Sequence, residues 1–326
     1  MPQTITKRKN GSRRVSFSTS GKCHVEQAHR DEVNINTIIA KYHKTGLCPR
    51  TTQIAQYGDF TGATDYHEAS LYSSNSFITL TYSPEHLPPY GSLIRGPKSP
   101  LTLFIKRLRK HHHGIDPIVN SESKTTYPIR YFACGEYGSK LSRPHYHVCL
   151  FNFNFTDRVL WSERENVKLY RSKQLEKLWP YGYSTIGDVT WESAAYVARY
   201  VTKKVNGDRA ATHYLKDFNP DTGECIYLEP EYITMSRRPG IAANWFKKFG
   251  SDCYPKDYVT HNGKKLRIPS FYDRIYDRTE PDALSTIKLA RRKAACNSDH
   301  TTPGRLRARE TVQKEQAKRL IRGIEV

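Results

Sequence analysis

The stretch Pro128–Phe155, PIRYFACGEYGSKLSRPHYHVCLFNFNF, decides the fold of this chain. It contains two apolar runs, Tyr131–Cys134 and Val148–Phe151, separated by the polar, Gly- and Pro-containing segment Gly138–Pro144. Aromatic and β-branched residues with turn residues between them favour two antiparallel strands joined as a hairpin. We therefore predict a β-hairpin that the other elements surround.

Three side chains of this hairpin indicate a metal site. Side chains alternate between the two faces of a strand, so His145 and His147 share one face. If the hairpin closes symmetrically about residues 140–141, Glu136 falls opposite His145, close enough to share a ligand with it. Two imidazoles and a carboxylate then predict a bound metal ion. The alternative is a pair of solvated histidines, because a lone His-x-His also occurs by chance.

The composition indicates a polyanionic partner. The 326 residues include 52 Lys and Arg against 32 Asp and Glu, for a net charge of +20, and 37% are hydrophobic. A core is therefore feasible, and the charge favours nucleic acid first and an anionic membrane second. No apolar run is long enough to cross a bilayer, and no signal peptide is visible. The seven cysteines form no CxxC pair, which favours a reducing, intracellular compartment.

Periodicity and turn residues predict further elements along the chain. Residues 1–24 are basic and are predicted to be disordered, and residues 48–66 to be loop or linker. Ser99 and Pro100 begin a helix that Gly114 closes, and the three histidines of its last turn are interpreted as solvated. The remaining expected elements are helices at 31–44 and 172–179, strands at 77–82, 183–189 and 231–236, a basic turn at 237–240, and a helix-prone basic tail from residue 284.

Residues 190–205, TWESAAYVARYVTKKV, are the second segment that contains candidate catalytic residues. A threonine in the cap position and an apolar stripe predict an amphipathic helix. Tyr196 and Tyr200 lie one turn apart beside that stripe, and Lys203 and Lys204 continue their row. The commoner role of such tyrosines is packing at the rim of a core. A phenol has a pKa of about 10 and needs a nearby cation to be a nucleophile near neutral pH, which a following lysine supplies.

Other basic residues are candidate DNA contacts. In the segment Trp245–Phe249, aromatic and basic residues alternate, and core packing with a solvated edge is slightly favoured over base stacking. The basic tail is interpreted as a solvated surface with nonspecific DNA contact as an addition. The residues expected to touch DNA are Arg143, Arg199, Arg237, Arg238, Lys247 and Lys248.

Three segments in this order, FITLTY, GEYG…RPHYHVCLF and YVARYVTKK, resemble the rolling-circle replication initiators of the HUH endonuclease superfamily. The similarity is to the initiators of gokushovirus-like Microviridae phages and covers about residues 67–249. It implies an α+β fold, with a central antiparallel sheet of about five strands flanked by helices. It also implies site residues: His145, His147 and Glu136 as metal ligands, Tyr196 and Tyr200 as paired nucleophiles, and Lys203 or Lys204 as the accompanying lysine.

The N-terminal part resembles a different protein of the same phages. Initiators of this family usually begin with a cysteine-rich segment of the type CGQCxGCR, which this sequence lacks. Instead, residues 15–66, with DEVNINTIIAKYHKTG and QYGDF, are similar to the internal scaffolding protein. We expect a fusion joined near residues 66–69. The expected domains are an extension at 1–66, an initiator domain at 67–250 and a basic region at 251–326.

The resemblance implies metal-dependent, origin-specific nicking and joining of single-stranded viral DNA through a 5′-phosphotyrosine. The expected cofactor is Mg²⁺ or Mn²⁺, the expected partners are host polymerase and helicase, and the expected location is the host bacterial cytoplasm, with no membrane and with a capsid contact through the scaffold-like segment. Alternatives are a catalytically impaired DNA-binding or capsid-associated fusion, and an HUH relaxase or transposase. A non-haem iron oxygenase also uses two histidines and a carboxylate, but explains neither the tyrosine pair nor the charge.

Overall fold

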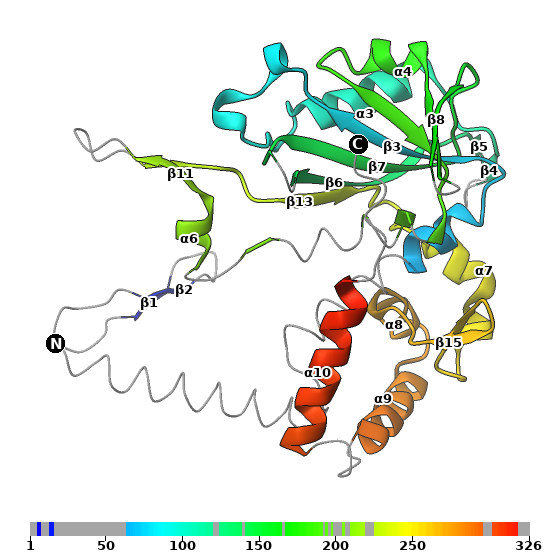
Figure 1. Cartoon of the computed structure of the whole chain (residues 1–326). Coiled ribbons are helices and arrows are strands. Elements are labelled where there is room, and N and C mark those ends of the chain that lie inside the picture. Colours follow the sequence, from blue (N-terminus) through cyan, green and yellow to red (C-terminus); the bar gives the residue numbers. More distant parts are fainter. Residues whose placement is uncertain are drawn as a thin grey trace, which may run out of the picture. The chain divides into compact units, whose positions relative to one another are not determined.

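The structure is a computed structural model of the whole chain (Figure 1). The chain divides into two units, which are taken separately: residues 52–289 with 318–326, and residues 1–51 with 290–317. The described residues are 5–7, 13–15, 63–119, 124–138, 141–164, 167–191, 193–194, 197, 204–205, 209–218, 225–295 and 302–318.

A seven-stranded antiparallel sheet forms the centre of the larger unit, in the order β13-β6-β7-β3-β10-β9-β8 (Figure 1). The predicted α+β class is confirmed, and the sheet is wider than the expected five or so strands because the hairpin of β8 and β9 adds an edge. That hairpin has exposed apolar side chains rather than a buried alternating face, so its sequence gave no clear strand signal. The strands are β3 (Asn75–Thr81), β6 (Arg130–Tyr137), β7 (Pro144–Phe151), β8 (Val159–Arg164), β9 (Val167–Arg171), β10 (Ser184–Gly187) and β13 (Tyr232–Met235).

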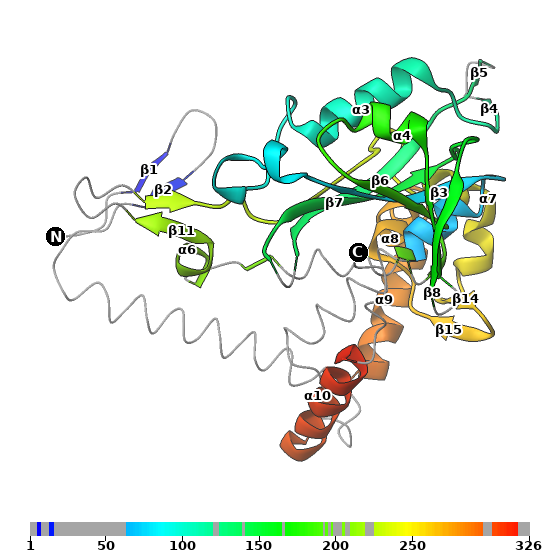
Figure 2. The same cartoon turned by 45° about the horizontal axis from the view of Figure 1, so that its top comes forward.

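Two helices cover one face of this sheet, α3 (Pro100–His111) and α4 (Lys173–Leu178), as Figure 2 shows. Their apolar side chains, including Phe104 and Leu175, are buried against strand residues such as Ile78 and Val148. α3 begins as predicted: the Ser99 hydroxyl accepts a hydrogen bond from the Thr102 N–H at 3.2 Å. It ends at its C-cap His112, before the glycine expected to close it.

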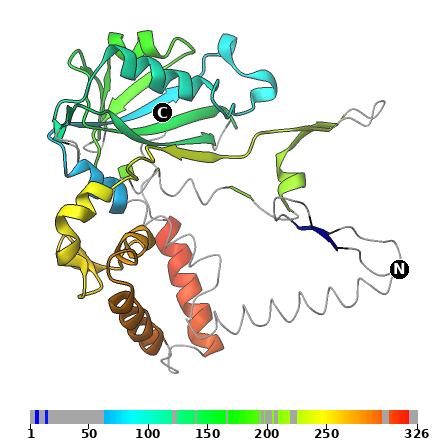
Figure 3. The same ribbon diagram turned by 180° about the vertical axis from the view of Figure 1, so that it is seen from behind.

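The opposite face packs against α7 (Ala243–Cys253), α8 (Ser270–Tyr276) and the start of α9 (Pro281–Ala295) (Figure 3). Phe246 and Tyr272 from these helices join Phe77, Phe132 and Cys149 from the strands in one buried cluster. We call this side of the sheet the α7 face. A helix at residues 63–69 also packs here and begins within residues 48–66, which were predicted to be loop or linker. Ala69 at its end and the nearby Tyr72 bury their side chains in the same cluster.

Most of the other sequence-predicted elements of this unit are confirmed, including the helix at α4, the strands at β10 and β13 and the turn after β13. The interpretation of Trp245–Phe249 is also confirmed: Phe246 is buried in the core, and Lys247 and Lys248 are exposed on α7. Several short elements had no sequence signal. They are η1 (Pro84–His86), η2 (Pro89–Gly91), β4 (Ile118–Val119), β5 (Thr125–Thr126), α6 (Arg209–Tyr214), β11 (Leu215–Phe218), β12 (Cys225–Tyr227), β14 (Val259–His261) and β15 (Lys264–Leu266).

In the smaller unit, β1 (Ile5–Lys7) and β2 (Arg13–Val15) form an antiparallel pair within the segment predicted to be disordered. The basic tail is helical as predicted, with α9 followed by α10 (Pro303–Lys318). The helix expected at residues 31–44 lies outside the described residues. Among the described helices, none combines the length and apolar character that a membrane crossing requires.

Candidate metal centre and tyrosine helix

The hairpin of β6 and β7 closes in the register that the sequence predicts. Glu136 pairs with His145, and Cys134 pairs with His147. At the turn, the Gly138 N–H donates to the Arg143 carbonyl at 3.0 Å. Because side chains alternate along a strand, this register places both histidines and the glutamate on the α7 face.

The three predicted ligands meet at one point. Glu136 Oε1 lies 2.7 Å from His145 Nε2 and 2.9 Å from His147 Nε2. Their ligand atoms all lie within 4.8 Å of one another. Glu136 and His147 are 1% exposed at their side chains and His145 is 12% exposed, so the site opens to solvent on the His145 side. The alternative of two separately solvated histidines is therefore wrong.

The ring of His145 is oriented for metal binding. Its Nδ1 lies 3.1 Å from the Arg143 carbonyl oxygen, which only accepts hydrogen bonds, so Nδ1 carries a proton. Its Nε2 faces the Glu136 carboxylate oxygen at 2.7 Å. A proton shared between these two atoms, or a metal ion bound by both, satisfies this close approach.

The ring of His147 is held in a similar way. Thr79, from the neighbouring strand β3, places its Oγ1 3.0 Å from His147 Nδ1. The Phe77 ring stacks on His147 with 5.6 Å between the ring centroids. A hydrogen bond on one imidazole nitrogen fixes the direction of the other, which in this ring faces Glu136. Thr79 was missed from the sequence because its role depends on the pairing of β3 with β7.

Electrostatics keep Glu136 ionised. Burial alone raises the pKa of its carboxyl, but hydrogen bonds from His145 and His147 outweigh burial and lower the pKa to about 2. By contrast, burial raises the pKa of the nearby Cys149 thiol, so sulfur stays protonated and is a poor ligand there. The donors that remain are two imidazole nitrogens and a carboxylate oxygen, which suit a divalent ion such as Mn²⁺.

The predicted tyrosine helix begins where the sequence indicates. The Ser193 N–H donates to Thr190 Oγ1 at 3.2 Å, and the Thr190 N–H donates to Ser193 Oγ at 2.8 Å. This reciprocal pair caps the helix, and the Ala194 N–H then donates to the Thr190 carbonyl at 3.0 Å. Val197 is fully buried in the cluster on the α7 face. The helix therefore packs against the same face of the sheet that carries the three metal ligands.

Val205, at the end of this segment, is linked by hydrogen bonds to the start of β13. The Val205 N–H donates to Tyr214 Oη at 3.0 Å, and the Tyr214 hydroxyl donates to the Glu231 carboxylate. Glu231 directly precedes the residue that pairs with Gly135, the neighbour of Glu136. Of the predicted catalytic residues, Lys204 is half-buried in this region. Tyr196, Tyr200, Lys203 and Arg199 lie outside the described residues.

A buried ion pair supports the opposite end of β6. The Arg130 guanidinium donates to Glu68 and to the carbonyls of Pro239 and Gly240, at 3.0 and 2.9 Å for the two carbonyls. Glu68 also accepts a hydrogen bond from the Ala242 N–H. This pair ties the helix at residues 63–69 to the start of β6 and to the turn before α7. No sequence motif indicated the pairing, which joins residues far apart in the chain.

Among the described residues, the predicted DNA contacts fall at separate places on the molecule. Arg143 lies at the metal end of the hairpin, with its Nη1 3.4 Å from the Tyr82 carbonyl oxygen. Arg237 and Arg238 are exposed in the turn after β13. This turn is hydrogen-bonded to Arg130, the first residue of β6. Arg130 precedes Glu136 by six residues, which is roughly 20 Å along a strand.

Fold and site together define the class: an α+β protein with a two-histidine, one-carboxylate centre on an antiparallel sheet and a capped helix on the same face. Two family models match. Residues 75–205 match the replication-associated protein ORF2/G2P family, and residues 4–76 match the Chlamydia-phage Chp2 scaffold family. Residues 75–205 are therefore similar to phage replication-associated proteins, and both predicted resemblances are confirmed.

Individual relatives agree with this placement. The replication-associated protein ORF2 of Spiroplasma virus 4 is 36% identical over 230 residues, 68% of this chain and 64% of the relative. The replication-associated protein VP4 of Bdellovibrio phage phiMH2K is 32% identical over 220 residues, 67% of this chain and 62% of the relative. The chain thus spans slightly less than two thirds of either relative. No solved structure matches.

Proposed function

We propose that this protein nicks and rejoins single-stranded DNA at a viral replication origin, with a tyrosine as nucleophile and a divalent metal ion. The proposal rests on the position of the three candidate metal ligands relative to the helix that contains Val197. Glu136, His145 and His147 meet on the α7 face, and the helix that contains Val197 packs against that same face. In this proposal Tyr196 and Tyr200, which flank Val197 in the sequence, act on the same side of the sheet as the metal ligands. Similarity to phage replication-associated proteins is consistent with this chemistry.

Glu136, His145 and His147 would hold Mg²⁺ or Mn²⁺, and the mixed imidazole and carboxylate donors favour Mn²⁺. When bound, this ion supplies Lewis-acid polarisation of the scissile phosphate. The residues around it supply rigidity, because the Arg143 carbonyl and the Thr79 hydroxyl hold the two rings before substrate arrives. A preorganised set of ligands costs little reorganisation when charge develops.

The reaction itself is a transesterification. The phenol of Tyr196 or Tyr200 loses its proton to water, and its oxygen bonds to phosphorus. The P–O3′ bond breaks, and the leaving oxygen takes a proton from water to become a 3′ hydroxyl. The products are a 5′-phosphotyrosine and a primer end for host polymerase, acting with host helicase. The second tyrosine then cuts the regenerated origin, and the released 3′ hydroxyl attacks the first phosphotyrosine to close the circle. Lys203 or Lys204 stabilises the phenolate or the charge on the phosphate.

The substrate in this proposal is viral single-stranded DNA in the host bacterial cytoplasm. The net charge of +20 supplies general affinity for a phosphate backbone, while sequence choice depends on a few base contacts. The segment matching the phage scaffold family would add a contact with the capsid. Viral DNA and the capsid are thus the two phage partners of the proposed function.

A covalent-adduct assay tests this function. The protein is incubated with origin oligonucleotides and Mn²⁺, and adducts that survive SDS are resolved by electrophoresis. We expect an adduct in the wild type, retention in one of Tyr196→Phe and Tyr200→Phe, and loss in the double variant. An adduct that persists in the double variant would show that neither tyrosine is the nucleophile.

A second candidate is a fusion protein that binds DNA without cutting it. The match of residues 4–76 to a scaffold family favours it, since that segment stands beside the replication segment. It predicts DNA binding with no adduct under any metal condition, whereas the nuclease predicts both. The same electrophoretic assay with a filter-binding control separates the two functions.

A further inference from the structure

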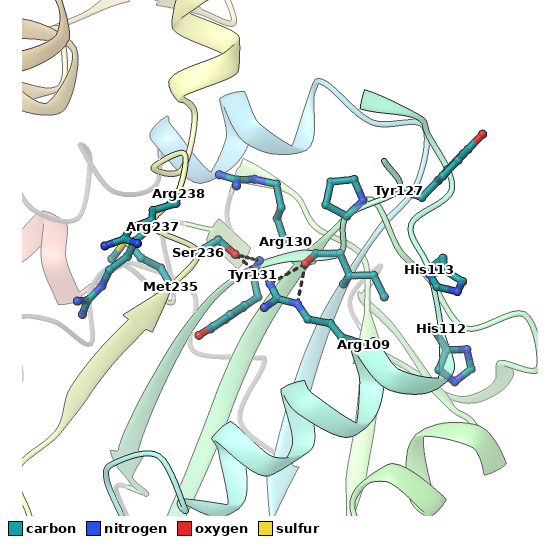
Figure 4. A pocket seen from close by; sticks show the side chains of 12 residues that line it. Arg109, His112, His113, Tyr127, Arg130, Tyr131, Met235, Ser236, Arg237 and Arg238 are labelled. Carbon is teal, nitrogen blue, oxygen red and sulfur yellow. Dashed lines mark hydrogen bonds between the residues drawn. The ribbon is translucent and has the colours of Figure 1, made fainter. Parts of the chain in front are cut away.

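A strongly basic cavity lies at the end of the sheet away from the metal centre. Its volume is about 700 Å³, and none of its twelve lining residues is acidic. One wall is the segment directly after α3, with His112 and His113. The other wall is the turn after β13, with Arg237 and Arg238 (Figure 4). We call it the arginine cavity.

The cavity has a rigid floor. Arg109 donates from Nε and Nη2 to the Ile129 carbonyl oxygen, at 3.0 and 2.7 Å, and from Nη2 to Ser236 Oγ at 3.3 Å. Its guanidinium also lies over the Tyr131 ring, 5.3 Å from the centroid. All of these partners are uncharged, so they orient the cation, and no carboxylate of the described part of the chain forms an ion pair with it. Figure 4 shows Arg109 between the two walls.

The turn that presents the other two arginines is also fixed. Buried Arg130 donates to the carbonyls of Pro239 and Gly240, and its own charge is balanced by Glu68. Arg237 and Arg238 themselves are exposed at the cavity. The lining of the cavity therefore carries three guanidinium groups, those of Arg109, Arg237 and Arg238, with no acidic lining residue among them. Such an arrangement is stabilised when an anion binds.

An exposed aromatic ring on the lining narrows the class of anion. Tyr127 is 49% exposed, and its ring is free to meet a base. Guanidinium groups for phosphates together with an aromatic ring for a base are the two components of a single-strand binding surface. A free phosphate would use the arginines alone. A nucleic-acid strand uses both.

We propose that the arginine cavity binds the DNA strand that flanks the cleavage site, at a distance from the nick. The inference rests on the proposed function for its substrate. Arg130 and Glu136 are six residues apart on β6, so the cavity and the metal centre are roughly 20 Å apart along the strand. At about 3.4 Å per nucleotide in a stacked strand, this spans on the order of six nucleotides. The cavity therefore holds the substrate in register while the metal centre acts on its phosphate.

The test is the salt dependence of binding to labelled oligo(dT) of 6 and 24 nucleotides, measured by fluorescence anisotropy with full-length protein. The variant is Arg237→Gln with Arg238→Gln. The matched control is Lys256→Gln with Arg278→Gln, which removes the same charge from exposed positions outside the cavity. For the longer oligonucleotide we expect the cavity variant to reduce the slope of log K against log salt by about 1.4, because each phosphate neutralised on a single strand contributes about 0.7.

We also expect Tyr127→Ala to weaken binding of the 24-mer by about fivefold or more, with the salt slope unchanged, because base stacking carries no counterion release. Equal losses in the cavity variant and the control would overturn the inference in favour of diffuse attraction. A wild-type slope in the cavity variant would overturn it as well. A third result would also overturn it: Tyr127→Ala keeps the wild-type affinity for the 24-mer, and millimolar inorganic phosphate displaces the 24-mer. The cavity would then be a simple anion site.

These outcomes are independent of cleavage. His147→Ala removes a proposed metal ligand, and it is expected to abolish the covalent adduct while leaving the salt slope of the 24-mer unchanged. If the adduct never forms but the cavity variant changes the slope, the nuclease proposal fails and the DNA cavity stands. If the adduct forms and the slope does not change, the cavity inference alone fails.

Discussion

Glu136 and His145 face each other directly across the β6–β7 hairpin, with 2.7 Å between Oε1 and Nε2. His147 approaches the same oxygen from two residues further along β7. The centre is built on paired strands rather than on loops, so the backbone of the sheet fixes the spacing of its donors.

Metal binding is expected to stabilise the folded protein through this centre. An ion that binds only the native state at a hundredfold excess over its Kd adds about 2.7 kcal/mol. For a domain of this size that corresponds to a rise in Tm of about 5 to 10 °C. Differential scanning fluorimetry with Mn²⁺ should show this rise in the wild type and lose it in Glu136→Gln. The exposed Glu163→Gln is the matched control and should keep the rise. A full rise in Glu136→Gln would exclude the carboxylate as a ligand.

Thr79 is expected to be a positioning residue for His147. Thr79→Val keeps the shape of the side chain and removes the hydroxyl that lies 3.0 Å from His147 Nδ1. Loss of such an outer partner typically reduces metal affinity by about 10- to 100-fold. Titration calorimetry with Mn²⁺ measures the change, and Thr79→Ser should restore most of the affinity. An unchanged Kd in Thr79→Val would mean that packing alone orients the ring.

Removing Glu68 should destabilise the fold strongly. Its carboxylate is the charged partner of buried Arg130 and also accepts the Ala242 N–H. Breaking a buried pair from one side leaves an uncompensated charge, which costs about 3 to 5 kcal/mol. Urea unfolding of Glu68→Gln should show this loss, and Glu163→Gln should change stability by less than about 0.5 kcal/mol. The double variant Glu68→Gln with Arg130→Met should lose less than the two single changes added together.

Acid should destabilise the protein through His67. Burial, with a smaller contribution from His261, lowers the pKa of His67 from 6.5 to about 4. The folded state therefore disfavours the protonated ring. The stability contribution is fully present above pH 6.5 and is lost as the pH falls toward 4, by on the order of 3 kcal/mol. Urea unfolding at pH 7 and pH 4.5 should show a smaller loss in His67→Asn than in the wild type.

Asp65 provides a comparison of opposite sign. Its two carboxylate oxygens are buried without a hydrogen-bond partner among the described residues, and burial and Glu68 raise its pKa. The cost of ionising it is present above the unfolded pKa and is relieved as the pH falls. Asp65→Asn should therefore stabilise the protein at pH 7, with a smaller gain at pH 4.5. A destabilising effect at pH 7 would show that this carboxylate has a favourable partner.

The sequence by itself determined the hairpin and its register. Alternation places His145 and His147 on one face, and the turn length sets Glu136 opposite His145, because both depend only on local backbone geometry. The start of the 190–205 helix was predictable for the same reason, since a cap involves residues three apart. The identity of the replication segment and of the scaffold segment was also readable from motifs in order.

Only the tertiary structure decided which distant residues complete these local units. Thr79 reaches His147 because β3 pairs with β7. Tyr214 binds both the Val205 N–H and Glu231, which directly precedes β13, the strand paired with β6. The arginine cavity likewise joins the end of α3 to the turn after β13. Such contacts depend on strand order and on packing between distant segments, so no local sequence pattern encodes them. Arg109 and Ser236, for example, are more than a hundred residues apart in the chain.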